Sequence, residues 1–230
     1  MKTILVTGAS KGIGYETALA LLNSGNKVVA VARSTDKLAA LKENAASELV
    51  HIVTADITTE SGLDSIKKVI SKAGNIDGLI NNAGMVLNKP FMETSKQEWQ
   101  SVFDVNLFAP VHLIRELKSF FNKKAHIVNI GSMGGFQGSD KFPGLAAYST
   151  AKGALAIFSE SLSAEFSSEE IAVNCLCLGA VQTEMLAQAF PGYQAPVQPK
   201  EMGEYISEFT LTAHKFMNGK VIPVSLNNPE

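Results

Sequence analysis

The chain has 230 residues, of which 46% are hydrophobic and 18% charged, as in an ordinary folded domain with a substantial core. Its formal net charge of −2 offers no broad basic surface to nucleic acid or to an anionic membrane, and no apolar run reaches the roughly 18 residues of a spanning helix. The apolar run after Met1 is too short for a secretory signal, so we expect a cytoplasmic protein with one domain over residues 1–230.

Short β-branched runs alternate with longer amphipathic stretches along the chain. We predict strands at 3–7, 27–32, 49–54, 76–80, 125–130, 170–177 and 220–224, and helices near 12–24, 35–46, 60–73, 95–121, 148–167 and 201–215. The strands are apolar almost throughout, which is typical of a parallel sheet covered on both faces. The alternation predicts an α/β fold, a doubly wound (Rossmann) sheet of about seven strands. Such sheets bind ligands beyond the carboxyl ends of their strands.

A glycine-rich turn joins the first predicted strand to the first helix, and it reads Thr7-Gly8-Ala9-Ser10-Lys11-Gly12-Ile13-Gly14. Gly8 permits a tight turn, Gly12 leaves room beside a pyrophosphate, and Gly14 lets the helix pack closely on the sheet. The free N–H groups and positive end of that helix would then face the phosphates. The turn therefore predicts a dinucleotide site, with contacts from Gly8, Ser10, Lys11, Gly12, Ile13 and Gly14.

The end of the second strand bears on the choice of dinucleotide. An NAD site usually carries a carboxylate here for the ribose 2′-hydroxyl, but the chain has Ala32 followed by Arg33. A guanidinium at this position suits a 2′-phosphate, and Lys11 adds a second positive charge. The alternative is a solvated arginine after a strand. We expect NADP(H) rather than NAD(H).

Polar and small residues also follow the third and fourth strands. Asp56, next to Ile57, could accept a hydrogen bond from an adenine amino group, or it could cap the helix that follows. The fourth strand leads into Asn81-Asn82-Ala83-Gly84, which suits close approach of a cofactor. We expect contacts from Asp56, Ile57, Asn81, Ala83 and Gly84.

Ser132, Tyr148 and Lys152 could surround a single carbonyl oxygen. Tyr148 and Lys152 are four residues apart, on one face of a predicted helix, and Ser132 ends the fifth strand. The positive charge of Lys152 would lower the pKa of Tyr148 from its usual value near 10, and Ser132 would stabilise charge developing on the substrate oxygen. The Tyr/Lys spacing alone is common, so its value depends on the motifs around it.

Taken in order, the glycine turn, Asp56, Asn81-Asn82-Ala83-Gly84, Asn106, Ser132 and Tyr148-x3-Lys152 resemble a short-chain dehydrogenase/reductase of the single-domain Rossmann type. The resemblance covers about residue 3 to at least residue 185. It implies that Lys152 also holds the nicotinamide ribose and that Asn106 supports a water-linked proton relay. Without it, Asn106 would be a helix asparagine facing a neighbouring backbone. Gly179, Val181 and Thr183 fit the family's cofactor-contacting segment.

The chain departs from the family pattern at two places. The usual Pro-Gly after the sixth strand is Leu178-Gly179, which we expect to leave this segment freer and bulkier. After the last strand, the usual Gly-Gly is replaced within Ser225-Leu226-Asn227-Asn228. The substrate loop, about 183–200, is short, and this favours an open pocket with loose selection.

The helix from 148 to 167 carries the apolar stripe Leu155, Phe158, Leu162 and Phe166 and many small residues. The stripe is typical of packing on the sheet, and small residues on the opposite face would suit close pairing with a second subunit. Because the family often associates through such helices, we expect a homodimer or homotetramer.

The two cysteines and four histidines do not indicate metal or redox chemistry. Cys175 and Cys177 alternate with apolar residues, so they point to one side of a strand and are expected to be buried and unpaired. The histidines, at 51, 112, 126 and 214, lack ligand spacing, so we predict no metal site.

The leading hypothesis is an NADP(H)-dependent, carbonyl reductase-like oxidoreductase that moves hydride between nicotinamide and a carbonyl or alcohol carbon. Tyr148 would give or take the proton, assisted by Lys152 and Ser132. The alternative is a catalytically silent regulatory or scaffold protein that binds nucleotide on the same fold. An epimerase or dehydratase is disfavoured because no large C-terminal substrate domain follows. The predicted pocket lining is Met133, Gly134, Phe136, Phe142, Leu145 and the 183–200 loop.

Overall fold

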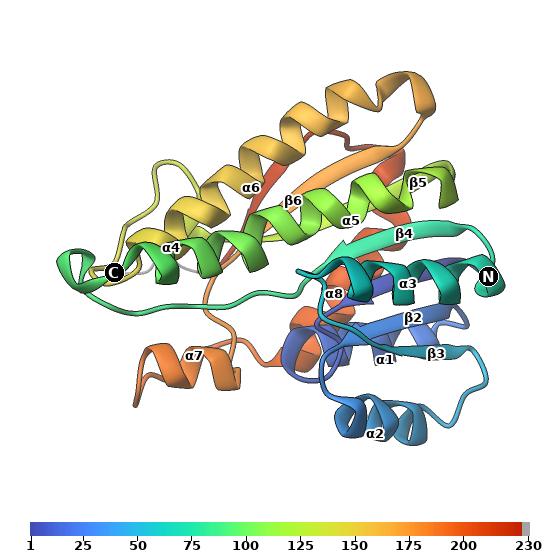
Figure 1. Ribbon diagram of the computed structural model, residues 1–230, viewed down its shortest axis with the longest axis horizontal. Helices are drawn as coiled ribbons and strands as arrows, with labels where there is room; N and C mark the ends of the chain where they lie inside the picture. The colour runs from blue at the N-terminus through green and yellow to red at the C-terminus, as the bar shows by residue number, and fades with distance from the viewer. Residues whose placement is uncertain (227–230) are drawn as a thin grey trace.

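Parallel strands in the order β3-β2-β1-β4-β5-β6-β7 form the sheet at the centre of the protein, seen in Figure 1 in a computed structural model that describes residues 1–226. The strands are β1 (Thr3–Thr7), β2 (Lys27–Ala32), β3 (Val50–Thr54), β4 (Ile76–Asn81), β5 (Phe121–Ser132), β6 (Ala172–Leu178) and β7 (Val221–Val224). All seven predicted strands are confirmed. The order is that of a doubly wound sheet with its reversal between β1 and β4, which confirms the predicted fold class.

Helices cover both faces of this sheet. They are α1 (Gly12–Asn23), α2 (Thr35–Ala45), α3 (Glu60–Ala73), α4 (Lys96–Phe103), α5 (Ala109–Leu117), α6 (Ala146–Glu165), α7 (Glu184–Ala189) and α8 (Pro199–Thr212). In Figure 1, α3, α5 and α6 lie in front of the sheet, and α1 and α8 lie behind it. Neighbouring residues of one strand serve opposite cores: Ile4 packs with α1 and α8, whereas Leu5 packs with α3 and α5.

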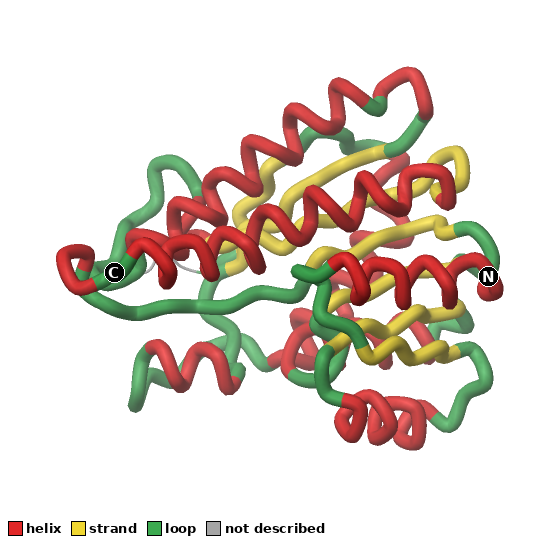
Figure 2. The backbone as a smooth tube through the Cα atoms, in the orientation of Figure 1, coloured by secondary structure: helices red, strands yellow, loops and turns green. Residues whose placement is uncertain are grey.

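Two helical predictions differ from the structure. The helix expected at 95–121 is divided into α4, a π-helical segment at Asp104–Phe108, and α5, and residue 121 already belongs to β5. The short helix α7 was not predicted, because Pro191 and Gly192 follow it within three residues and suggest loop. Figure 2 shows the long connections gathered at one side of the sheet, where α7 also lies.

No helix within residues 1–226 is long and apolar enough to cross a membrane. Asn227 and Asn228, which the sequence analysis singled out, lie outside the described residues.

Candidate active site

A cavity of about 1070 Å³ lies beyond the carboxyl ends of the strands. Its lining comes from the segments that follow β1, β2, β3, β4, β5 and β6, so a single cavity collects the motifs found along the chain. Because β3 and β2 stand at one side of the sheet and β5 and β6 toward the other, Asp56 and Arg33 lie at one end of the cavity and Ser132 at the other. The cavity therefore has two ends that are lined by chemically different side chains.

The glycine turn has the backbone that its sequence predicted. Gly8 and Gly12 both have positive φ, +68° and +57°, which glycine adopts with little cost. A Cβ on Gly8 would lie 2.9 Å from the Cα of Ala83, and one on Gly14 would lie 2.5 Å from the carbonyl oxygen of Gly8. Gly8 and Gly12 line the cavity, whereas Gly14 sits beneath it and serves the packing of the turn. Ser10, Lys11 and Ile13 also line the cavity.

Two asparagines after β4 have different positions. The side chain of Asn82 lines the cavity and donates hydrogen bonds to the carbonyl oxygens of Thr7 (3.0 Å) and Gly8 (3.3 Å), which ties this segment to the glycine turn. Asn81 is buried inside the sheet and donates to Asn129, 2.8 Å away. The structure therefore brings Asn82, Ala83 and Gly84 to the cavity but not the predicted Asn81, because β4 extends one residue further than expected.

Positive charge lies at the end of the cavity formed by β2 and β3. Arg33 is exposed there, and Lys37, on the first turn of α2, lines the same end. Asp56 and Ile57 are across from them after β3. Asp56 accepts hydrogen bonds from the backbone N–H of Thr58 (2.9 Å) and from its hydroxyl (2.7 Å); these bonds, with the charge of Arg33, lower the pKa of Asp56. It does not cap α3, because Thr59 performs that role.

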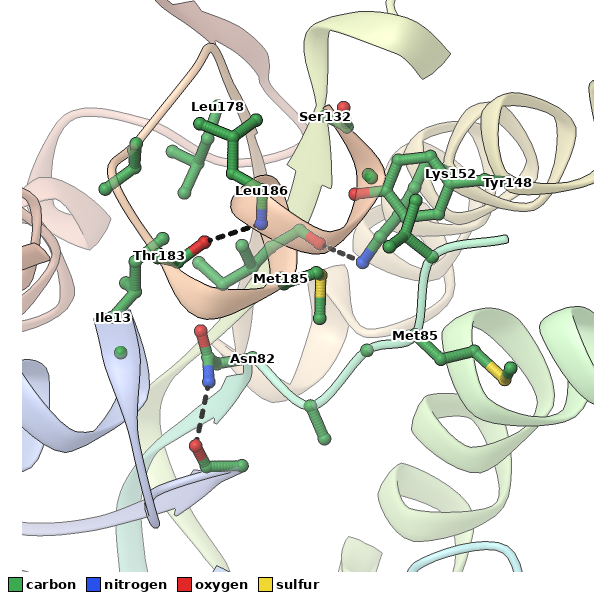
Figure 3. Close-up of a pocket in the computed structure, with 18 of the residues that line it drawn as sticks. Ile13, Asn82, Met85, Ser132, Tyr148, Lys152, Leu178, Thr183, Met185 and Leu186 are labelled. Carbon is green, nitrogen blue, oxygen red and sulfur yellow. Dashed lines mark hydrogen bonds between the residues drawn. The ribbon is translucent and has the colours of Figure 1, made fainter. Parts of the chain in front are cut away.

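The predicted trio meets at the other end of the cavity (Figure 3). Tyr148 and Lys152 stand one turn apart on α6, and Ser132, the last residue of β5, lines the same end of the cavity. The Nζ of Lys152 lies 6.0 Å from the centre of the Tyr148 ring and donates to the carbonyl oxygen of Ile130 at 2.7 Å. This places a hydroxyl, a phenol and an ammonium around one open volume.

The close approach of β5 to α6 depends on Gly135. It belongs to the short 3-10 helix Met133–Gly135 that follows Ser132. A Cβ on Gly135 would lie 2.5 Å from the backbone nitrogen of Gly153 and 2.6 Å from the carbonyl carbon of Lys152. Only a residue without a side chain allows the turn after Ser132 to pack this closely against the backbone of α6.

Burial has opposite effects on the two ionisable groups. It raises the pKa of Tyr148, partly offset by the hydrogen bond from Ser132, and it lowers the pKa of Lys152 to about 8. The expected lowering of the Tyr148 pKa by Lys152 is therefore wrong in this structure. The reason is geometric: the ammonium is bound to Ile130, and desolvation dominates at the phenol.

Asn106 lies beside the cavity without lining it. It is fully buried in the π-helical segment. Its Oδ1 accepts a hydrogen bond from the backbone N–H of Met85 at 3.3 Å, and its Nδ2 donates one to the carbonyl oxygen of Met85 at 2.8 Å. A Cβ on Gly84 would lie 3.0 Å from the Oδ1 of Asn106 and 3.6 Å from the Nζ of Lys152, so the two residues flank Gly84. Asn106 thus positions the segment that passes Lys152, and a part in a proton relay stays a prediction.

The segment after β6 starts from a residue held in the sheet. Leu178 is the last residue of β6, buried, and paired with Ser132 on one side and Val224 on the other. Leucine, unlike proline, keeps the backbone N–H that a strand within a sheet uses, and the greater freedom expected of the segment stays a prediction. Gly179 and Val181 line the cavity. Thr183 lines it as well and caps α7 by accepting a hydrogen bond from Leu186.

The small residues of α6 are also placed differently. Ala156, Ser159 and Ser163 are buried against the chain's own sheet rather than presented to a second subunit, and Ser159 accepts a hydrogen bond from Asn129 at 2.8 Å. The sequence pattern showed that these small residues lie on one face of α6, but it did not show that this face packs on the sheet of the same chain. Cys175 and Cys177 are buried and unpaired, as predicted. Among residues 1–226, no cluster of His, Cys, Asp and Glu could hold a metal ion.

Sequence reasoning missed several residues of the cavity. Lys37 stands four positions after Arg33, a spacing that could have identified it as a second cation on the helix that follows. Asn82 was named in its motif but was not assigned a contact. Met185 and Leu186 line the cavity within the 183–200 segment that was predicted to do so, but their place on a helix was not predicted. Phe136, by contrast, was predicted to line the pocket but packs against Met133 and the two cysteines.

Comparison with known proteins identifies the class of protein. The sequence profile of the family described as short chain dehydrogenase matches residues 2–194, and the chain belongs to this family. Among curated relatives, an uncharacterised oxidoreductase of Staphylococcus saprophyticus is 32% identical over 100% of this chain and 91% of its own length. One from Staphylococcus aureus (strain N315) is 29% identical over 97% and 96%. Enzymes of this family use nicotinamide cofactors and act on small molecules.

Solved structures agree with this assignment. The 3-ketoacyl-(acyl-carrier-protein) reductase from Brucella melitensis, complexed with NADH, has a TM-score of 0.88 and 25% identity over 97% of this chain and 96% of its own. A short-chain dehydrogenase/reductase from the same organism has a TM-score of 0.90 at 24% identity, over 100% and 97%, which shows the same fold.

Proposed function

We propose that the protein is an NADP(H)-dependent oxidoreductase that interconverts a carbonyl compound and its alcohol. The observation that carries the proposal is that Ser132, Tyr148 and Lys152, with Lys152 one turn from Tyr148 on α6, line the same cavity as the glycine turn. When bound, NADPH would supply the hydride. Every other catalytic group comes from the chain itself.

The residues of the cavity fit a nicotinamide dinucleotide. Gly8 and Gly12 hold the backbone in a conformation that leaves the entry of α1 free of side-chain bulk, and the N-terminal N–H groups of α1 suit a pyrophosphate. Arg33, Lys37 and Lys11 would hold a 2′-phosphate, and Asp56 would accept from the adenine amino group. Lys152 and the segments containing Ala83 and Gly179 would hold the nicotinamide end.

The three catalytic residues have separate tasks in reduction. Tyr148 is a neutral phenol because burial raises its pKa, and it donates its proton to the substrate oxygen. Ser132 donates a hydrogen bond to that same oxygen as negative charge develops on it. Lys152, whose pKa of about 8 leaves it mostly protonated at pH 7, would hold the nicotinamide end of the cofactor beside Tyr148.

The decisive experiment measures NADPH oxidation against a panel of carbonyl compounds, with Tyr148→Phe beside the wild type. We expect turnover by the wild type and a loss of at least about 100-fold in kcat for Tyr148→Phe, with NADPH binding retained. Full activity in Tyr148→Phe would refute the mechanism. NADPH binding without turnover of any compound would instead favour a silent nucleotide-binding protein.

We further propose a single catalytic unit over residues 1–230 that associates as a homodimer or homotetramer. Support comes from apolar side chains exposed on neighbouring elements of one face: Ile157 on α6 is 66% exposed, and Phe108, before α5, is 39% exposed. Sedimentation equilibrium tests this proposal, and a monomer at micromolar concentration would contradict it.

A further inference from the structure

Apolar side chains make up much of the catalytic end of the cavity, around the polar groups of Ser132, Tyr148 and Lys152. Phe142 and Leu145 lie on the segment before α6. Met185 and Leu186 lie on α7 and Leu178 at the end of β6 (Figure 3). The rings of Phe142 and Phe190 meet edge to face with centres 5.9 Å apart, so the segment before α6 and the end of α7 close on each other. The walls are therefore packed against one another, and these side chains present hydrocarbon and thioether; the uncharged phenol of Tyr193 also lines the cavity.

Polar side chains within and beside these walls hold the segments together. The Nδ2 of Asn88 donates to the carbonyl oxygen of Ala189 at 2.7 Å, and Gln182 accepts from the N–H of Ala195 at 2.7 Å. The hydroxyl of Thr183 accepts from Leu186. These groups fix α7 over the cavity and are not directed at a substrate.

Charge is distributed unevenly along the cavity. In the part of the chain that the structure describes, the charged residues that line it are Lys11, Arg33, Lys37, Asp56 and Lys152. Four of these belong to the glycine turn or to the segments after β2 and β3, at the end proposed for the 2′-phosphate and adenine. Lys152 alone stands at the catalytic end, and it is buried and bound to the carbonyl oxygen of Ile130.

We propose that the substrate is an uncharged ketone whose body is aromatic or aliphatic, without a carboxylate or phosphate. An anionic group on the body of the substrate would lose its hydration with no free cation to replace it, because Lys152 is bound to Ile130, and this cost is large. Hydroxyl-rich carbonyl compounds would likewise leave their hydroxyl groups unpaired against Phe142 and Met185. In the reaction the ketone carbon takes hydride from NADPH and its oxygen takes the proton of Tyr148, which gives a secondary alcohol and NADP⁺. The inference rests on the proposed function.

The test compares matched substrates that differ in charge far from the ketone. Methyl 4-acetylbenzoate is measured against 4-acetylbenzoate, and methyl 6-oxoheptanoate against 6-oxoheptanoate, with dihydroxyacetone as the hydroxylated compound. We expect each ester to exceed its acid in kcat/KM by about 100-fold or more, and dihydroxyacetone to be the poorest. Equal rates for ester and acid, or a preference for dihydroxyacetone, would overturn the substrate class.

A pair of variants separates charge from intrinsic reactivity. Met185→Lys adds a cation to the wall, whereas Met185→Gln adds a side chain of similar length without charge. We expect the ester-to-acid ratio to fall at least about tenfold in Met185→Lys relative to Met185→Gln. An equal ratio in the two variants would show that the missing cation does not set the preference.

The outcomes also separate this inference from the function on which it rests. If NADPH quenches the protein fluorescence, and so binds, yet no ketone of either charge is reduced, the proposed function fails. If only the acids are reduced, the oxidoreductase stands and the substrate class is wrong.

Discussion

The ammonium of Lys11 lies 2.5 Å from the carboxylate of Glu184, and this ion pair joins the glycine turn to the first residue of α7. It lowers the pKa of Glu184, as expected for a carboxylate that accepts from a cation. The pair connects the proposed cofactor site with the helix that covers the catalytic end. A 2′-phosphate near Lys11 would therefore compete with Glu184 for the same ammonium.

The first prediction follows from that competition. We expect Glu184→Gln to tighten NADPH binding by about two- to fivefold, the range of an exposed ion pair, and to leave NADH binding unchanged. Fluorescence titration measures both affinities. Glu165→Gln, an exposed glutamate at the end of α6, removes the same charge and should alter neither. Weaker NADPH binding in Glu184→Gln would mean that the pair positions Lys11 for the cofactor.

Arg33 provides the second prediction, which concerns cofactor choice. Because its guanidinium would form charge-assisted hydrogen bonds to a 2′-phosphate, Arg33→Ala should weaken NADPH binding by about tenfold or more and leave NADH binding unchanged. Lys42→Ala, on the same helix as Lys37 but outside the cavity, is the matched control. Equal losses for both cofactors would contradict a role for Arg33 in NADP(H) selection.

The pKa of Lys152 sets a third prediction. The residue is a cation below its pKa of about 8 and neutral above it, and we expect only the cation to hold the nicotinamide end of the cofactor for the reaction. We therefore expect kcat/KM for reduction to be level below about pH 7 and to fall tenfold per pH unit well above pH 8. In Lys152→Arg the guanidinium keeps its charge, so any remaining activity should lack this fall. A level wild-type profile up to pH 10 would be inconsistent with this role.

The sequence predicted that Ser132, Tyr148 and Lys152 share one end of the cavity, because its signals are local. Tyr148 and Lys152 share a helix face by spacing, and the glycine turn needs only its own backbone. What it could not predict depends on contacts between distant segments. The bond from Lys152 to Ile130 joins residues 22 positions apart, and it is part of the reason the expected effect on Tyr148 failed. Likewise, the residue spacing identified the face of α6 that carries Ser159, but it could not show that this face packs on the sheet.

A fourth prediction concerns stability away from the cavity. His126 is buried, with Nδ1 3.0 Å from the carbonyl oxygen of Thr210 and Nε2 2.9 Å from the amide nitrogen of Asn174, which fits a neutral ring. Burial lowers the pKa of His126 from 6.5 to about 4. The unfolded chain therefore binds the proton more readily, and stability is lost as pH falls below about 6.5.

As the pH falls from 7 to 5, protonation of this group in the unfolded chain should lower the free energy of unfolding by about 2 kcal/mol. Urea denaturation at each pH measures this change. In His126→Phe that part of the pH dependence should disappear, whatever the absolute stability of the variant. His112→Gln, at an exposed position on α5, should retain it. An unchanged pH dependence in His126→Phe would assign the acid sensitivity to other groups, among them His214, whose pKa is also lowered by burial.

The last prediction tests whether the contact between β5 and α6 assembles the catalytic residues. A methyl group on Gly135 would meet backbone atoms of Lys152 and Gly153 at 2.6 and 2.5 Å, and backbone cannot move aside without shifting α6. Gly135→Ala should therefore lower stability by about 1–3 kcal/mol and kcat/KM by more than tenfold, while NADPH still binds at the glycine turn. Gly134→Ala is the matched control, because its methyl group would meet the side-chain oxygen of Ser149 at 3.0 Å, which can rotate away. If both variants keep wild-type melting temperature and activity, the turn after Ser132 does not set the distance between Ser132 and Tyr148.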